Sequence, residues 1–268
     1  MGEKLRFSII ESFREWVPED DIIAAPTPEI KAQGKKMLIC GYCVLVEHPT
    51  LGRILFDTGV HNDWENTWND TMKDLYNIVS FNDLRGELAK ANLTAEDIDI
   101  VVVSHLHYDH AGNISMFQNT KAGQQIIISE AEAREAFVVT NLDDSGYCNA
   151  YWKPEFQNLE GIGYRLLTED TKLADDVVLF IQRGHTPGVV GMMLHAESGT
   201  YIFTSDGIYS SRNYGPPIHL PGLCYDPVAY VESVKKVAAF KEQYQAQIIF
   251  SHDVEDIDAW KKIPYFYE

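Results

Sequence analysis

Basic side chains are scarce in this sequence. Its 268 residues include 22 Lys and Arg against 40 Asp and Glu, which gives a formal net charge of -18 at pH 7. A surface this acidic repels phosphate backbones and anionic lipid head groups. The composition therefore argues against nucleic acid and membranes as partners.

Long apolar runs are also missing. No stretch approaches the roughly 18 apolar residues that a membrane-spanning helix needs, and the opening MGEKLRF lacks the basic and then apolar pattern of a signal peptide. We therefore expect a cytoplasmic protein. The chain has no internal repeat and no linker rich in Pro, Gly and Ser, so residues 1–268 are expected to form a single domain.

Cysteines are few, and their spacing does not indicate a metal knuckle. Cys40 and Cys43 form a C-x-x-C within MLICGYCVLVEH, which has the pattern of a strand, where side chains three positions apart point to opposite faces. A zinc ribbon would need a second close pair. We expect buried thiols at both positions.

The sequence does contain many apolar runs of strand length and fewer helical patterns. Strands are predicted in KLRFSIIES, MLICGYCVLVEH, GRILFDTG, IDIVVVS, QQIIIS, VVLFIQ, VVGMMLH, TYIFTS and AQIIFS. Helices are predicted over about 82–91, 130–138 and 226–244, after caps at Asn82 or Asp83, a Ser129-x-x-Glu132 capping box, and Asp226-Pro227. Helices lie between strands in both halves, which predicts an α/β fold with two layered sheets and helices outside.

Two segments, 60–80 and 140–165, do not fit this pattern. They carry aromatic side chains among polar ones, namely Trp64, Trp68, Tyr76, Tyr147, Tyr151, Trp152 and Phe156. Two interpretations stay open. The aromatics either form a lid and the walls of a substrate pocket or pack as a small core beneath long loops.

Side chains that bind metals follow four of the predicted strands. His105 follows IVVVS, His185 follows VVLFIQRG, Asp206 follows YIFTS and His252 follows QIIFS. Groups just past the carboxyl ends of strands converge at one edge of an α/β sheet. We expect these four side chains to share one cleft.

Three more donors, His107, Asp109 and His110, follow His105 closely. Seven donors exceed the three protein ligands of a single catalytic zinc and fit two ions that share one carboxylate. The remaining histidines lack such neighbours and are expected to be surface or loop residues, with His219 also a candidate for a pocket wall. They are His48, His61, His195 and His219.

The motif HLHYDH at 105–110, with His185 in GHTPG, Asp206 after FTS, His252 in SHD and FDTG at 56–59, resembles the metallo-beta-lactamase superfamily of hydrolases. The resemblance spans residues 37–253 and implies a four-layer αβ/βα metallo-beta-lactamase-type sandwich. It also implies two divalent metal ions. His105, His107 and His185 would bind one ion, Asp109, His110 and His252 the other, and Asp206 would bridge them. Zinc is the default, and iron, cobalt and manganese remain open.

The spacing Asp-x-x-Tyr from Asp206 to Tyr209 is similar to the quorum-quenching N-acyl homoserine lactonases and their pyridoxolactonase relatives. This implies a hydrolase that opens a lactone ring by a metal-bridging hydroxide. Tyr209 would stand beside the developing oxyanion and Asp109 would pass a proton to the leaving oxygen, so both are expected to be catalytic. Asp57 would orient a ligating histidine or the neighbouring loop. The segment from Asp109 to Asn113 has one glycine fewer than those lactonases often have, so the loop behind the ligands is expected to differ.

Other functions on the same fold remain open. A thioester hydrolase of the glyoxalase II kind uses a similar ligand set, but residues 220–268 predict one helix and a strand rather than a basic helical module for glutathione. A mononuclear iron oxygenase would leave His110 and His252 without a role. A non-catalytic binding protein would normally have lost ligands. A homodimer, common among similar proteins, is not indicated by any pattern.

Overall fold

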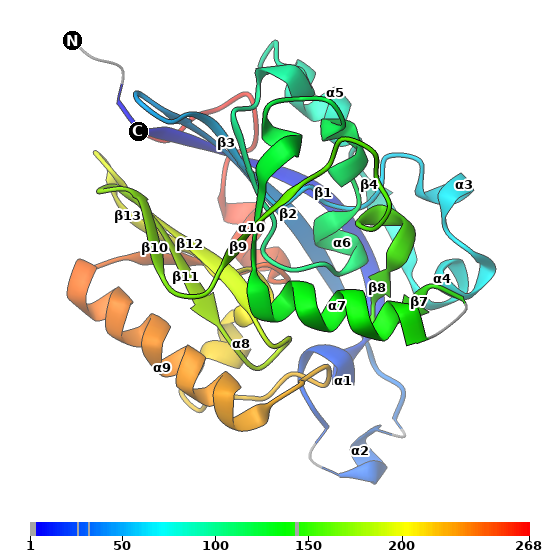
Figure 1. Ribbon diagram of the computed structural model, residues 1–268. Helices are drawn as coiled ribbons and strands as arrows, with labels where there is room; N and C mark the ends of the chain where they lie inside the picture. The colour runs from blue at the N-terminus through cyan, green and yellow to red at the C-terminus, as the bar shows by residue number, and fades with distance from the viewer. Residues whose placement is uncertain (1–3, 26, 32, 143–144) are drawn as a thin grey trace.

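Two β-sheets packed face to face form the centre of the fold in the computed structural model, which describes residues 4–25, 27–31, 33–142 and 145–268 (Figure 1). The larger sheet has the strand order β4-β1-β2-β3-β5-β6-β9. Its strands are β1 (Arg6–Pro18), β2 (Lys36–His48), β3 (Gly52–Phe56), β4 (Asn77–Phe81), β5 (Ile100–Val102), β6 (Ile126–Ser129) and β9 (Tyr164–Leu167). Strands β3, β5, β6 and β9 run parallel.

The smaller sheet has the order β10-β11-β12-β13-β14. Its strands are β10 (Thr171–Ala174), β11 (Val177–Gln182), β12 (Val189–Ala196), β13 (Gly199–Phe203) and β14 (Gln247–Ile249). Strand β12 is antiparallel to both β11 and β13, and β13 is parallel to β14. The carboxyl ends of β11, β13 and β14 therefore meet at the same edge.

Strand β2 shows why the sheets stack. Its central residues are buried on both faces. Cys40 lies in the apolar core between the two sheets, with Phe203 and Ile249, whereas Cys43 lies in the core on the outer side of the larger sheet, with Leu88. The two thiols therefore point to opposite faces and are buried, as the strand pattern predicted.

Helices cover the outer faces of both sheets and complete four layers. Helices α5 (Leu84–Ala89) and α7 (Glu130–Leu142) pack on the larger sheet, and α9 (Pro227–Tyr244) packs on the smaller one through Tyr230 and Val234 (Figure 1). The structure thus confirms the αβ/βα sandwich. Asp83 caps α5 and Asp226 caps α9 with their side chains, and α7 continues four residues beyond the predicted end at 138.

Short elements fill the connections. The remaining α-helices are α1 (Glu19–Ile22), α2 (Pro28–Lys31), α3 (Trp64–Thr67), α4 (Asp70–Leu75), α6 (Tyr108–Ala111), α8 (Ser211–Tyr214) and α10 (Val254–Ala259). The 3-10 turns are η1 (Ala95–Asp97), η2 (Ile114–Phe117), η3 (Ala122–Gln125), η4 (Lys153–Glu155) and η5 (Ser205–Gly207), and β7 (Tyr147–Cys148) pairs with β8 (Tyr151–Trp152).

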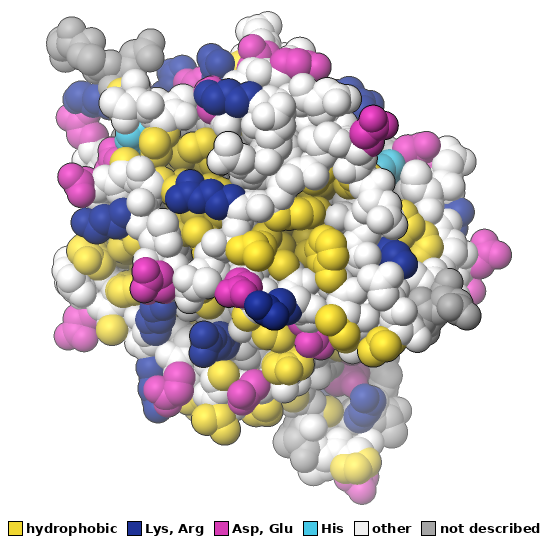
Figure 2. Space-filling model, in the orientation of Figure 1, with side chains coloured by type: hydrophobic (Ala, Val, Ile, Leu, Met, Phe, Trp, Pro, Cys, Tyr) yellow, Lys and Arg dark blue, Asp and Glu magenta, His cyan; other side chains and the backbone are white. Residues whose placement is uncertain are grey.

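The surface carries charges of both signs. Acidic and basic side chains are interspersed on the face shown in Figure 2, with apolar side chains between them. Within the described ranges, no helix is both long enough and apolar enough to cross a membrane.

Candidate metal centre

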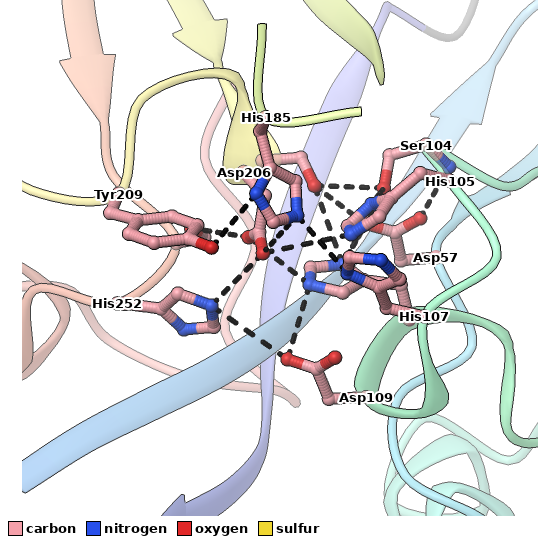
Figure 3. Close-up of polar contacts among 12 residues, drawn as sticks. Asp57, Ser104, His105, His107, Asp109, His185, Asp206, Tyr209 and His252 are labelled. Carbon is pink, nitrogen blue, oxygen red and sulfur yellow. Dashed lines mark hydrogen bonds and ion pairs between the residues drawn. The ribbon is translucent and has the colours of Figure 1, made fainter. Parts of the chain in front are cut away.

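Four strands place their ligand-type side chains at one edge of the sandwich. His105, His185, Asp206 and His252 each lie three residues beyond the last residue of β5, β11, β13 and β14, respectively. The first comes from the larger sheet and the other three from the smaller one, so the site lies between the two halves. Figure 3 shows these side chains pointing toward one another.

The segment after β5 supplies the other three donors because it changes conformation. His107 is still extended, with φ -68° and ψ 153°, and caps α6. The helix then begins, which turns Asp109 and His110 to a different part of the cleft. All seven donor side chains are buried.

The first donor group contains His105, His107, His185 and Asp206. Its donor atoms all lie within 4.8 Å of one another. Asp206 Oδ2 is 3.6 Å from His105 Nε2 and 3.5 Å from His185 Nε2. His107 Nδ1 is 3.1 Å from His185 Nε2. Four nitrogen and oxygen atoms at this spacing can surround one small cation.

The second donor group contains Asp109, His110, His252 and again Asp206, within the same 4.8 Å limit. Asp206 Oδ1 is 3.1 Å from His110 Nε2, and Asp206 Oδ2 is 3.2 Å from His252 Nε2. Asp109 Oδ2 lies 3.3 Å from His110 Nε2 and 3.7 Å from His252 Nε2. The carboxylate of Asp206 thus belongs to both groups.

Unsatisfied polar atoms indicate that these residues fit metal ions. Among the described residues, the buried Nε2 atoms of His105 and His110 find no hydrogen bond of good geometry. Buried polar groups rarely lack a partner without a reason, and a place for a metal ion is one such reason. Imidazole and carboxylate are ligands that zinc and related divalent ions accept.

The opposite ring nitrogen of each of three histidines is held in place. His110 Nδ1 lies 2.9 Å from Asp57 Oδ2, and His252 Nδ1 lies 2.7 Å from the Cys40 carbonyl oxygen. His185 Nδ1 lies 3.1 Å from the Leu223 carbonyl oxygen. Such contacts fix the tautomer and the ring orientation, so that the other nitrogen faces the centre.

Asp57 and two serines join these contacts behind the ligands. The Ser104 backbone N–H donates to Asp57 Oδ1 at 2.6 Å, and the Ser104 hydroxyl lies 3.0 Å from His105 Nδ1. The Ser205 hydroxyl donates to Ser104 Oγ at 2.8 Å. Asp57 therefore contacts His110 directly, which is the geometry expected of it, whereas the sequence alone did not indicate the two serines.

The electrostatics of the two groups differ. Burial, together with the neighbouring imidazoles, holds the pKa values of His105 and His107 well below their usual range, and burial also lowers the pKa of His185. Burial would lower the pKa of His252 as well, but Asp206 and Asp109 outweigh it and raise this pKa to about 9. The second group therefore stabilises positive charge, and the first offers neutral imidazoles, the form that binds metals.

Tyr209 lies at the rim of the first group. Its hydroxyl oxygen is 2.9 Å from His185 Nδ1, and its ring packs against His252 with centroids 4.9 Å apart. The side chain is buried, and burial raises the pKa of its hydroxyl well above the ordinary value. Tyr209 thus lies next to both donor groups.

Most aromatics of the two segments that the sequence left open pack in one apolar core beside this centre, where Trp64, Tyr76 and Tyr147 are only partly buried. Tyr151 and Phe156 lie instead in the core on the outer side of the larger sheet. Trp68 and Trp152 pack in one apolar core with Tyr108 and Tyr209. Tyr76 stacks on Tyr108 at a centroid distance of 3.8 Å. The aromatics therefore form a core under long loops, and this core borders the donor groups.

Two buried acids in this cluster were not foreseen. Glu15 accepts a hydrogen bond from the Tyr108 hydroxyl at 2.6 Å, and Glu155 accepts one from Trp68 Nε1 at 3.0 Å. Burial raises the pKa of each to about 8. Glutamates in a strand and in a 3-10 turn give no sign of burial in a sequence, because such residues are almost always exposed.

One expectation about the other histidines is wrong. His48 is only 8% exposed, and its Nε2 lies 2.9 Å from Asp176 Oδ1, while its Nδ1 accepts the backbone N–H of Leu51 at 3.0 Å. It is a buried structural residue rather than a surface one. Its acidic partner is 128 positions away, so no local pattern could reveal the pair.

Comparisons with known proteins agree with this geometry. Residues 41–246 match the family model described as the metallo-beta-lactamase superfamily. The chain is 28% identical over 287 residues to the N-acyl homoserine lactonase AiiB of Rhizobium rhizogenes, with 100% of both chains covered. It is 28% identical over 234 residues to an N-acyl homoserine lactonase of Bacillus cereus, which covers 84% of this chain and 86% of the relative.

Solved structures show the same fold. A quorum-quenching N-acyl homoserine lactone hydrolase superimposes with a TM-score of 0.80 at 22% identity, and 100% of both chains is covered. AidC, a dizinc quorum-quenching lactonase, superimposes with a TM-score of 0.64 at 20% identity, covering 99% of this chain and 94% of the other.

Proposed function

The chain belongs to the metallo-beta-lactamase superfamily, and from that membership we propose that it is a metal-dependent lactonase that opens N-acyl homoserine lactones. The observation that carries the proposal is the pair of adjoining donor groups that share Asp206. Relatives that align over the whole chain are N-acyl homoserine lactonases, which supports a lactone as the substrate. We propose quorum quenching as the biological role.

The donor set fits two divalent ions, which we propose to be zinc. His105, His107 and His185 would hold one, Asp109, His110 and His252 the other, with Asp206 between them. When bound, such ions act as Lewis acids on a carbonyl oxygen and lower the pKa of water to about 7. A mononuclear oxygenase would need only one ligand group, so the presence of two adjoining groups favours a hydrolase with two ions.

In this proposal Asp109 moves the proton. Hydrolysis adds the oxygen of water to the lactone carbonyl carbon, breaks the bond from that carbon to the ring oxygen, and leaves a hydroxyl where the ring oxygen was. The carboxylate of Asp109, which lies beside His110 and His252, accepts the proton from water and returns it to the departing ring oxygen. This is general base and then general acid catalysis by one group.

We assign Tyr209 to the carbonyl oxygen of the substrate. If His185 presents Nε2 to the centre, its Nδ1 carries the proton and donates to Leu223 O and to Tyr209 Oη. The proton of the Tyr209 hydroxyl is then available for the negative charge that develops on the substrate. The acyl chain would lie against the adjacent aromatic cluster at Tyr108 and Trp68.

The assignment is tested by a pH-drop assay of the zinc-loaded protein against acyl homoserine lactones, simple lactones and S-lactoylglutathione. We expect turnover of the lactones and two ions per chain by elemental analysis. A His252→Ala variant should lose one ion and most of the activity. His195→Ala, a control outside the centre, should keep two ions and full activity. Hydrolysis of the thioester alone, or saturation at one ion, would contradict the proposal.

We also propose a single domain over residues 1–268, a cytoplasmic location and a homodimer. Cooperative thermal unfolding in one transition, cell fractionation and analytical ultracentrifugation, respectively, check these three expectations.

A further inference from the structure

The first turn of helix α7 holds a buried acid whose side chain does not complete the capping box that the sequence predicts. Ser129 Oγ accepts the backbone N–H of Glu132 at 3.1 Å, which is one half of such a box. The carboxylate of Glu132 instead turns away from its own helix, where its Oε1 accepts the backbone N–H of Leu106 at 3.0 Å. Leu106 lies between His105 and His107, and Glu132 is fully buried.

Two hydroxyls from other segments also influence this carboxylate. Those of Thr186 and Tyr151 offset part of the rise in its pKa that burial causes, although its buried Oε2 makes no hydrogen bond of good geometry. Thr186 is the residue after His185. The ring of Tyr151 packs edge-on against His107 with centroids 4.6 Å apart, and the backbones of these two residues form a bridge.

Ser129, the residue before α7, also binds the backbone of the loop that carries His185. The Ser129 hydroxyl donates to the Gly188 carbonyl oxygen at 2.6 Å. A Cβ at Gly188 would lie 2.1 Å from Ser129 Oγ, so this close approach requires glycine. The loop that carries His185 is therefore held at a set distance from α7, and through Glu132 from the His105–His107 segment.

We propose that Glu132 is a positioning residue for the first donor group. Glu132 holds the segment that bears His105 and His107 through its carboxylate, and the start of its helix holds the loop that bears His185 through Ser129. It thereby sets the spacing of the three imidazoles and the affinity of that group for its ion. The inference rests on the proposed function only in taking these donors as metal ligands. Removing such a support behind a metal ligand typically weakens metal binding by about 10- to 100-fold.

The test compares three variants of one helix turn. Glu132→Leu keeps the side chain's bulk but has no acceptor, and Glu132→Gln keeps an acceptor oxygen for the Leu106 N–H. Glu130→Gln, on the same turn and paired with Arg134, is the control. Stepwise zinc affinity is measured by chelator competition, and the visible absorption of the cobalt-substituted protein reports the geometry of each site.

We expect Glu132→Leu to bind one of the two ions about 10- to 100-fold more weakly and to change the cobalt spectrum. Glu132→Gln should restore most of this loss, and Glu130→Gln should match the parent. In a His252→Ala background, where only the first group is complete, the affinity for the remaining ion should fall by the same factor. A purely structural role would lower the thermal stability without this selectivity between the two ions.

The outcomes separate this inference from the proposed function. Wild-type affinity for both ions in Glu132→Leu would overturn the role of Glu132 and leave the lactonase proposal intact. Two bound ions without lactone turnover would overturn the lactonase proposal and leave Glu132 in its role. Fewer than two ions in the wild-type protein would overturn the lactonase proposal, and the affinity of Glu132→Leu for the remaining ion would still decide the role of Glu132. If Glu132→Leu does not fold, the test uses Glu132→Asp, which keeps the carboxylate but is one methylene shorter. Affinities of Glu132→Asp for both ions equal to those of the parent would overturn the inference.

Discussion

Replacing Glu155 by glutamine should change how the stability of this protein depends on pH. Glu155 lies at the end of η4, is 3% exposed, and accepts a hydrogen bond from Trp68 Nε1 at 3.0 Å. Burial raises its pKa from 4.5 to about 8, the hydrogen bond from Trp68 lowers it, and the charge of Asp109 raises it further. At neutral pH the folded protein therefore holds this carboxyl group protonated.

The direction of this pH dependence follows from how tightly the unfolded and folded chains hold the proton of Glu155. The unfolded chain releases the proton near pH 4.5, whereas the folded chain keeps it up to about pH 8. The contribution of Glu155 to stability is thus fully present below pH 4.5 and is lost as the pH rises through 8. Between these two pKa values, each rise of one pH unit lowers the free energy of unfolding by about 1.4 kcal/mol for one such group. Between pH 5.5 and 7.5 the loss from Glu155 alone is about 3 kcal/mol.

Glutamine keeps an oxygen for Trp68 and has no proton to release. We expect the unfolding free energy of Glu155→Gln to fall less steeply than that of the parent, by about 1.4 kcal/mol per pH unit between pH 5.5 and 7.5. Urea unfolding at several pH values, with equal metal content in both proteins, measures the two slopes. The exposed Glu160, changed to glutamine, is the control and should leave the slope unchanged. Parallel slopes for Glu155→Gln and the parent would show that Glu155 is already ionised in the fold, which would refute the argument from burial.

Other perturbations test the centre and the core. Tyr209→Phe should lower kcat about 100-fold or more while elemental analysis still finds both ions, and an unchanged kcat would remove the role assigned to Tyr209. Asp57→Asn should weaken by about 10- to 100-fold the binding of the ion next to His110, as measured by chelator competition. Stripping the ions with a chelator should lower the Tm, and two equivalents of zinc should restore it; an unchanged Tm would mean that the folded and unfolded chains bind the ions equally. Phe203→Ala, in the core between the sheets, should cost about 3–5 kcal/mol in urea unfolding.

Much of the fold could be predicted because local chemistry decides it. Asp226-Pro227 caps and begins α9 where the sequence indicates, since both the capping side chain and the proline act within a few residues. The positions of His105, His185, Asp206 and His252 also follow from a local rule, because each stands directly after a strand.

The rest depends on contacts between distant segments. Glu132 looks like half of a capping box in the sequence, and only the packing of α7 against the Leu106 segment diverts its carboxylate. The same holds for His48 with Asp176. The burial of Glu155 could not be inferred either, because its partner Trp68 is 87 positions away.

The donor groups draw on both halves of the chain, and this has a consequence during synthesis. Asp206, which belongs to both groups, and His252, which completes the second, come from the half made later. A nascent chain still attached to the ribosome at residue 200 would carry His105, His107, Asp109, His110 and His185 but no bridging carboxylate. The complete donor set of both groups then forms only after the C-terminal half has left the exit tunnel and docked.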